Sequence, residues 1–309
     1  MTVLVCNMMT DPKGRELLQH GTAQFPVACY QDDLAREILP WHWHEELEAA
    51  VITEGTAVVS AGTEKYVIKA GGGFFINSGV LHAAQSADTS VCRFHSLVFH
   101  PRLVGGGADS IFWQKYIQPL MNDVSLKGLS FQPSVPWEKE VLEAVESAWQ
   151  SCHGEVPGYE FAVREFLSKV LFLLSGQKSP AQKKPSDKML RDADRVKQML
   201  WFIQEHFGEE ITIAQIAESA SVSESECLRC FRKNIGTTPI QYVKQYRIQK
   251  AAELLLATEQ KIVDIGIQCG FQEMSYFARS FREQRGCTPS QYRQQVREGG
   301  QEKGEQNAV

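Results

Sequence analysis

The pattern of apolar and polar positions changes its period once along the chain. Between residues 25 and 99, short runs rich in β-branched and aromatic residues alternate with Gly-containing turns. Regularly spaced short strands of this kind predict an all-β barrel or jelly roll. After residue 110 the apolar residues recur every three or four positions, which indicates helices. We expect helices at residues 111–124, 137–152, 159–174 and 191–207, and several more between residues 213 and 292.

A polar segment separates the β-rich part from the last helices. Residues 176–187 contain two prolines, three lysines and no apolar anchor, as expected of an exposed, semi-flexible linker. We therefore predict a first domain at residues 1–175, this linker at residues 176–187, a second domain at residues 188–298, and a polar, disordered tail at residues 299–309. Residues 1–20 fit either a flexible arm or a short helix.

Residues 211–293 contain one sequence unit twice. Arg229 recurs 50 residues later as Arg279, and Gly236 recurs as Gly286. An internal repeat of fixed period indicates a duplicated supersecondary structure. Each copy predicts a short helix, a turn, and a second helix that ends at the glycine, and a long helix at about residues 240–258 joins the copies. The same spacing relates Phe231 to Phe281, Arg232 to Arg282, Pro239 to Pro289 and Tyr242 to Tyr292.

Two capping residues mark the helix starts of the first copy. Thr212 is expected to cap the short helix, and Ser223 to cap the second helix, where Glu226 would complete a capping box. Cys227 and Cys230 have the spacing of a zinc-binding pair, but they fall on the buried face of this helix. Because no second pair lies at ligand spacing, we interpret both cysteines as core residues.

Many further positions of the duplicated unit carry characteristic residues, namely Ile216, Ala217, Val222, Ser223, Arg247, Ala251, Leu255, Ile262, Ile265, Gly270, Phe271, Tyr276, Phe277, Thr288 and Arg293. Together with the repeat, they resemble the DNA-binding module of the AraC/XylS family of transcription regulators. The resemblance covers about 100 residues, a third of the chain. It departs from the family at Gly266, where Ala is usual, and at Glu224, where a neutral or basic residue is usual.

The resemblance implies that the second helix of each copy enters the major groove of DNA. Arginines there are expected to pair with guanine, and apolar residues to touch thymine methyl groups. An ordinary helical bundle with solvated charged faces is the alternative, and the repeat argues against it. The expected base contacts are Glu224, Ser225, Leu228, Arg229, Met274, Ser275, Ala278 and Arg279, and the expected phosphate contacts are Arg232, Lys233, Arg282 and Arg285.

One polar constellation lies in the β-rich part. His42, His44 and Glu48 share one parity and so point to one face, and His82 follows in a later strand. The spacing resembles the cupin motifs, in which such residues bind a divalent metal, although Asn77 stands in place of the usual proline. Three interpretations remain open: a metal site in a sensor, direct hydrogen bonding to an organic effector, and a polar cluster that only supports the fold.

The predicted helix from Tyr159 to Leu174 has more apolar residues than one buried face requires. Simple packing on the β-rich part is one explanation. The family resemblance implies another, in which this helix and the one at residues 137–152 form an antiparallel pair that mediates a homodimer. We favour dimerisation.

Composition and charge limit the function only weakly. The net charge is −5, although residues 188–298 contain 16 Lys and Arg against 14 Asp and Glu. A mildly basic second domain predicts salt-dependent DNA binding of modest non-specific affinity. The chain has no apolar run of membrane-spanning length and no convincing signal peptide. Its eight scattered cysteines do not form a secreted disulfide pattern, so we expect a cytoplasmic protein.

These features predict a ligand-responsive, sequence-specific transcription regulator that binds double-stranded DNA. We expect a homodimer and an activator that is not an enzyme, with a small-molecule effector such as a sugar, and no membrane partner. The family resemblance implies contact with RNA polymerase. The alternative is a metal-dependent cupin enzyme, a dioxygenase or an isomerase, fused to a DNA-binding module, with His42, His44, Glu48 and His82 as its metal ligands.

Overall fold

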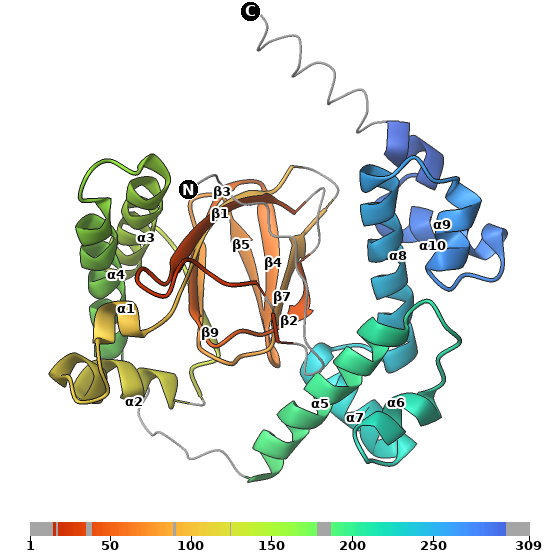
Figure 1. Ribbon diagram of the computed structural model, residues 1–309, viewed down its shortest axis with the longest axis horizontal. Coiled ribbons are helices and arrows are strands. Elements are labelled where there is room, and N and C mark those ends of the chain that lie inside the picture. Colours follow the sequence, from red (N-terminus) through yellow and green to blue (C-terminus); the bar gives the residue numbers. More distant parts are fainter. Residues whose placement is uncertain are drawn as a thin grey trace, which may run out of the picture. The chain divides into compact units, whose positions relative to one another are not determined.

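The computed structural model (Figure 1) describes residues 15–16, 18–34, 39–88, 91–123, 125–177 and 187–294. The chain divides into two compact units, Met1–Lys197 and Gln198–Val309, and each unit has its own architecture. Most of the predicted linker, residues 1–14 of the predicted arm and all of the predicted tail lie outside the described residues. No helix in the described ranges is long and apolar enough to cross a membrane.

Two antiparallel sheets form the body of the first unit (Figure 1), which confirms the all-β prediction. One sheet has the order β1-β8-β3-β6-β9 and the other the order β2-β7-β4-β5. The bounds of the strands are β1 Val27–Asp33, β2 Leu39–His42, β3 Leu47–Glu54, β4 Thr56–Ala61, β5 Glu64–Lys69, β6 Gly73–Ile76, β7 His82–Ser86, β8 Arg93–Phe99 and β9 Gly128–Phe131.

Strand β3 contributes to two apolar cores. Ala50 and Ile52 belong to a cluster that draws residues from both sheets, so they point between the sheets. Leu47 and Ala49 belong to a second cluster, on the opposite face of the first sheet, together with residues of the helices. Glu48 has the parity of Ala50, and its carboxylate therefore points between the sheets. Because both faces of β3 are buried, its sequence lacks a clear alternation of apolar and polar residues.

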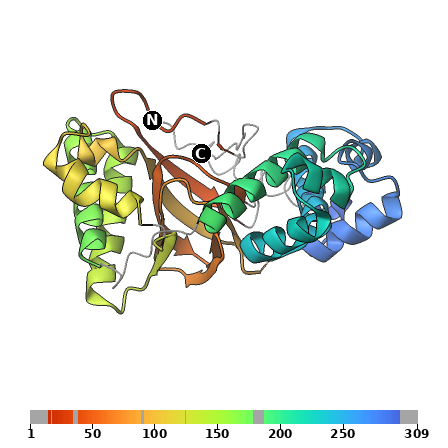
Figure 2. The same ribbon diagram turned by 90° about the horizontal axis from the view of Figure 1, so that it is seen from below.

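A layer of helices covers the outer face of the first sheet (Figures 1 and 2). Helices α3 (Pro136–Gly154) and α4 (Tyr159–Gly176) lie close to the ranges predicted from the apolar spacing, and they pack against each other there, as the family resemblance implies. The helix predicted at residues 111–124 is present but contains a π-helical turn, η1 (Trp113–Ile117), before α2 (Gln118–Met121). The short helix α1 (Arg102–Gly105) precedes them.

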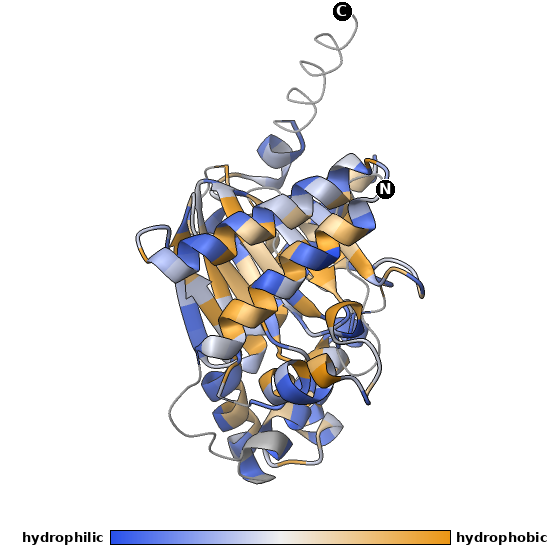
Figure 3. Ribbon diagram, turned by 90° about the vertical axis from the view of Figure 1, so that its left-hand side faces the viewer, coloured by the Kyte–Doolittle hydropathy of each residue, from blue (hydrophilic) through white to orange (hydrophobic). Residues whose placement is uncertain are grey.

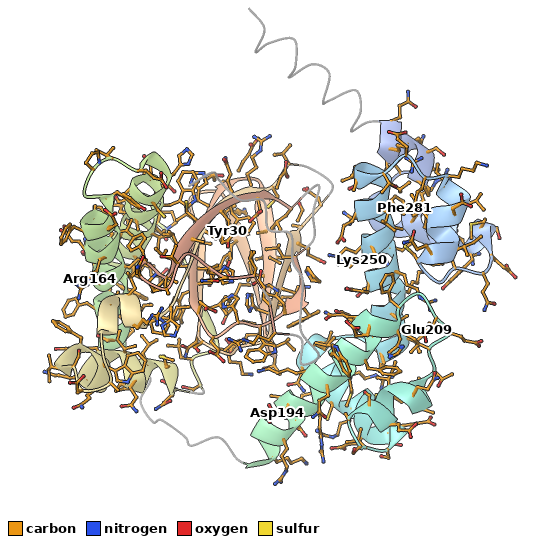
Figure 4. All side chains as sticks on the ribbon, in the orientation of Figure 1. Tyr30, Arg164, Asp194, Glu209, Lys250 and Phe281 are labelled. Carbon is orange, nitrogen blue, oxygen red and sulfur yellow. The ribbon has the colours of Figure 1, made fainter. Side chains whose placement is uncertain are left out.

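The second unit is entirely helical in its described part. Its helices are α5 (Asp187–His206), which begins in the first unit, then α6 (Ile213–Ser219), α7 (Glu224–Ile235), α8 (Pro239–Ala257), α9 (Ile262–Gln268) and α10 (Met274–Arg285). Pairs α6–α7 and α9–α10 are the two predicted copies, and α8 joins them. Phe277 and Phe281 are buried between α8, α9 and α10, as Figure 4 shows for Phe281. The duplicated helical architecture is thus confirmed.

The turns of the two copies match closely in backbone conformation. Ser221 in the first turn has φ 53°, and Gly270, which lies 49 residues later, has φ 78°. Residues after the turn are 50 apart, so the second copy has one additional residue at this point. Glycine adopts a positive φ without strain, whereas the same conformation is strained at Ser221. The two copies therefore share the backbone conformation of the turn although the residue types differ.

The predicted capping box at the start of α7 is wrong in one half. Ser223 does accept a hydrogen bond from the backbone N–H of Glu226. The Glu226 carboxylate, however, binds Arg229 one turn further along the same helix. A complete capping box lies instead at the start of α6, between Thr212 and Gln215.

Candidate effector site and DNA-binding surface

Three histidines meet between the two sheets of the first unit. His42 ends β2 and His82 begins β7, and the two residues are direct partners across this strand pair. Their ring centroids lie 4.1 Å apart, and the ring of His44 lies 4.9 Å from that of His82. One ring nitrogen from each of the three lies within 4.8 Å of the other two. All three side chains are buried.

Backbone carbonyl groups fix the orientation of these rings. Nδ1 of His42 lies 2.8 Å from the carbonyl oxygen of Pro40, and Nδ1 of His82 lies 2.8 Å from that of Val80. Nδ1 of His44 lies 3.1 Å from the carbonyl oxygen of Glu46. A carbonyl oxygen can only accept, so each Nδ1 carries the proton and each Nε2 keeps its lone pair. This is the arrangement in which histidines bind metals.

Glu48 adds a carboxylate to the three imidazoles. Its Oε2 lies 3.1 Å from Nε2 of His82 and 3.8 Å from Nε2 of His44. Burial alone would raise the pKa of Glu48, but the facing imidazoles outweigh burial and keep that pKa below its ordinary value. Burial and the neighbouring His82 lower the pKa of His42 to about 3. The four residues selected from the sequence, His42, His44, Glu48 and His82, thus lie close together in the fold.

Two further residues of the cluster were missed. Glu16 and His20 are buried, and Oε2 of Glu16 lies 3.3 Å from Nε2 of His20 and 4.0 Å from Nε2 of His42. Burial would raise the pKa of Glu16, but His20 and His42 lower it to about 2. The four-residue spacing of Glu16 and His20 is a sequence signal that could have found them. Because residues 1–20 fit either a flexible arm or a short helix, they could not be assigned a place in the fold from the sequence.

The cluster passes a test for metal binding. Among the described residues, Nε2 of His44 and Nε2 of His82 are buried without a hydrogen bond, and in both rings Nδ1 holds the proton. Buried polar atoms normally have a partner, so these lone pairs call for one. In the same cluster, two carboxylates bring negative charge that a divalent cation would balance. Imidazole and carboxylate donors suit zinc, iron, cobalt or nickel better than calcium.

Helix α7, the first predicted recognition helix, exposes its predicted contacts to different degrees. Glu224 and Ser225 are exposed, and Leu228 is half-buried. Arg229 is also half-buried, because Nε and a terminal nitrogen donate to the Glu226 carboxylate at 2.8 and 2.6 Å. The Glu226 carboxylate therefore competes with any DNA base for the guanidinium of Arg229. The expected phosphate contacts on α7, Arg232 and Lys233, are exposed.

The second recognition helix, α10, has a more open face. Ser275 and Arg279 are exposed and border a surface groove of about 1210 Å³ that also runs along α8. The guanidinium of Arg279 lies over the half-exposed ring of Tyr276, a residue that was not among the predicted DNA contacts. Arg282 is exposed. Three other predicted contacts, Met274, Ala278 and Arg285, are only half-exposed.

Two of those half-exposed residues have a packing role. Met274 packs against the apolar cluster of α8, α9 and α10. Arg285 lies over the ring of Tyr292, and its Nε is buried without a hydrogen bond in the described structure. Both residues therefore support the helix that carries Arg279, whatever they contribute to DNA contacts.

Comparisons with known proteins agree with this architecture. Residues 24–149 match the model of the AraC-like ligand-binding domain, and residues 216–295 match a helix-turn-helix domain model. The chain is 33% identical to the uncharacterized HTH-type transcriptional regulator YdeC of Bacillus subtilis, over 93% of this chain and 98% of that protein.

Two other similar proteins match different shares of the chain. The HTH-type transcriptional activator RhaS of Klebsiella pneumoniae is 25% identical, over 88% of this chain and 94% of that protein. The solved C-terminal domain of AraT, a response regulator from Geobacillus stearothermophilus, is 33% identical over 33% of this chain and 84% of that chain, with a TM-score of 0.32. The two family models, the nearly full-length similarity to YdeC and the duplicated helix-turn-helix units together assign the chain to the AraC family of ligand-responsive, DNA-binding transcription regulators.

Proposed function

We propose that the first unit binds a divalent transition metal through His42, His44, Glu48 and His82, and that this metal is part of the signal that controls DNA binding. The observation that carries the proposal is the shared orientation of the three imidazoles. Each donates Nδ1–H to a backbone carbonyl and directs Nε2 toward the others. When bound, the metal supplies a positively charged centre to which an effector oxygen can coordinate.

The apolar core limits where an organic effector can bind. Phe74, Phe94 and Ile52 are fully buried between the sheets and occupy the part of the interior beyond the histidines. An organic effector, whether a sugar or a small acid, would therefore bind at the histidine end. There it would contact the metal or hydrogen-bond to the same four side chains that we assign as ligands.

A regulator without catalytic activity accounts for these features better than an enzyme. YdeC and RhaS are both named as transcription regulators. We place this regulator in the cytoplasm, with its DNA.

Homodimerisation through α4 completes the proposal. Phe161 and Phe172 on α4 are 82% and 65% exposed, and they border an apolar groove of about 560 Å³ together with Phe112. Figure 3 views the helix layer from outside and shows apolar segments on it. Arg164, labelled in Figure 4, and Glu165 line the same groove and would pair across a two-fold axis.

The relative RhaS is named as an activator, and we propose the same direction of control for this chain. Activation requires that the bound dimer contacts RNA polymerase, as expected for the family. A reporter gene behind a selected binding sequence tests the direction. Expression should rise when the chain is produced, and a fall would make the protein a repressor.

Metal analysis of the untagged full-length chain, purified without chelators, tests the metal site. We expect one equivalent of a transition metal per chain, and its loss in His44→Ala. Glu146→Ala, which removes a carboxylate outside the cluster, serves as a control and should retain the metal. Metal-free wild-type protein that takes up no added zinc, cobalt or nickel would exclude the proposed site, while the assignment as a DNA-binding regulator would stand.

A further inference from the structure

The N-terminal segment, of which residues 15, 16 and 18–20 are described, is built into the end of the first unit where the histidines lie. The backbone N–H of Glu16 donates to the carbonyl oxygen of Trp43 at 2.8 Å, and Arg15 forms a parallel bridge with the same residue. Leu18 packs against Ala28 and Tyr30, whose side chains form a small apolar cluster with Val98. The segment is therefore held by backbone and apolar contacts beside the polar cluster.

Within this segment, Glu16 is aimed at the proposed metal ligands. Its side chain is almost completely buried, and Oε2 approaches Nε2 of His42 to 4.0 Å. This is the nitrogen that the Nδ1 contact with Pro40 leaves with its lone pair. A carboxylate oxygen and an imidazole lone pair repel each other at this separation, unless a cation lies between them.

His20 holds Glu16 in this position. Its Nε2 lies 3.3 Å from Oε2 of Glu16, and its Nδ1 lies 2.8 Å from the hydroxyl of Tyr30 on β1. Its ring also stands edge-on to that of His44, with the centroids 5.5 Å apart. His20 thus connects the sheet, the segment and the histidine cluster. A buried imidazole between a hydroxyl and a carboxylate is a typical support for a metal ligand.

We propose that Glu16 is a further ligand of the metal, that His20 positions it, and that metal binding thereby fixes the N-terminal segment to the first unit. The inference rests on the proposed metal site, because it adds a second carboxylate to that site. Ligands from three strands (His42, Glu48 and His82), from the loop residue His44 and from a separate segment make the segment's position depend on the metal. The bound metal ion then holds this segment against the first unit.

Cobalt(II) is the probe for the first test, because its visible spectrum responds to the number and type of ligands. Chelator-treated full-length wild type, Glu16→Gln, His20→Gln and Glu45→Ala are titrated with cobalt(II). Glu45 pairs with Arg15 on the surface of the same segment and is the matched control. Glu16→Gln should weaken cobalt binding about tenfold or more and change the spectrum, as expected when a ligand or its support is lost. His20→Gln should weaken binding less, and Glu45→Ala should match wild type.

Limited proteolysis provides a second test. Trypsin cleaves after Arg15, at the bond that precedes Glu16. We expect cobalt(II) to slow this cleavage in the wild type and a chelator to restore it. In Glu16→Gln, whose fold is checked by circular dichroism, cobalt(II) should give no protection.

The outcomes separate the two proposals. If wild type binds one cobalt ion and Glu16→Gln binds it with the same affinity and spectrum, Glu16 is not a ligand and only this inference fails. Cleavage at Arg15 that is equally fast with and without bound cobalt would also overturn it. If wild type binds no cobalt, the metal site itself is excluded, and the inference falls with it.

Discussion

Gly266 of α9 leaves the space that Met274 of α10 occupies. A Cβ atom at position 266 would lie 2.8 Å from Sδ of Met274 and 3.0 Å from Cδ1 of Phe277. The resemblance leads one to expect alanine at this position. Glycine here is matched by the larger side chain of Met274 on α10. The small residue lets a larger one pack beneath the face that carries Arg279.

This relationship predicts a coupling between the two positions. Gly266→Ala gains about 1 kcal/mol of helix propensity but overpacks the contact, which costs about 1–3 kcal/mol, so we expect a net loss of stability. In the Met274→Ala background the same substitution should cost less, with an interaction energy of about 1 kcal/mol. Urea unfolding of the four variants measures it. Gly176→Ala is the control, because nothing lies within 4 Å of its Cβ. Additive effects would refute the packing argument.

The two recognition arginines should differ in their effect on DNA affinity. Arg279 is exposed, whereas Arg229 must first leave the Glu226 carboxylate. On a DNA sequence selected from random duplexes, Arg279→Ala should lose about 1–3 kcal/mol of binding free energy, and Arg229→Ala less. Lys139→Ala, in the first unit, is the control. Fluorescence anisotropy at fixed salt measures the affinities. Undiminished specific binding by Arg279→Ala would show that α10 does not read bases through this residue.

The contact between Glu146 and His95 predicts that part of the free energy of unfolding depends on pH. Its Oε2 lies 3.0 Å from Nδ1 of His95, and this hydrogen bond lowers the pKa of Glu146. A carboxyl whose pKa is lower in the folded state stabilises the fold above the ordinary glutamate pKa, about 4.3, and loses this effect as the pH falls through its folded pKa.

We therefore expect Glu146→Gln to cost less than about 1 kcal/mol near neutral pH, because the pair is partly exposed, and to approach wild type in stability as the pH falls through the lowered folded pKa of Glu146. Urea unfolding at a series of pH values measures the difference, with the exposed Glu143→Gln as a control on the same helix. A difference that stays constant with pH would rule out the ionised pair as its source.

The exposed phenylalanines of α4 predict the oligomeric state. A charge at Phe161 or Phe172 would have to be buried in the proposed dimer, so Phe161→Asp and Phe172→Asp should shift the chain to the monomer in analytical ultracentrifugation. Val67→Asp, at an equally exposed apolar position on β5, should leave the dimer intact. A wild type that sediments as a monomer at micromolar concentration would contradict this use of α4.

The sequence predicted features that are repeated or locally spaced. The two helix-turn-helix copies follow from residues such as Arg229 and Arg279 at a fixed interval. His42 and His44 were selected because they stand in one short motif. They do meet, but the predicted alternation along one strand is wrong, since β2 ends at His42 and His44 lies outside the strands.

Features that depend on distant packing could not be predicted. The place of Glu16 beside His42 depends on the backbone bridge to Trp43 and on contacts of Leu18 and His20, which leave no periodic signal in the sequence. The engagement of Arg229 by Glu226 was missed for another reason. The same glutamate spacing also fits a capping box, and only the structure shows which partner it takes.

DNA affinity of the full-length chain with and without metal tests the central claim most directly. Chelator-treated protein and the same protein with one equivalent of zinc(II), or of whichever metal co-purifies, are compared on the selected sequence. We predict a change of about 5- to 150-fold, the usual range of coupling between two sites, and no change in His44→Ala. Equal affinities with and without a metal that is demonstrably bound would contradict the claim that this site controls DNA binding.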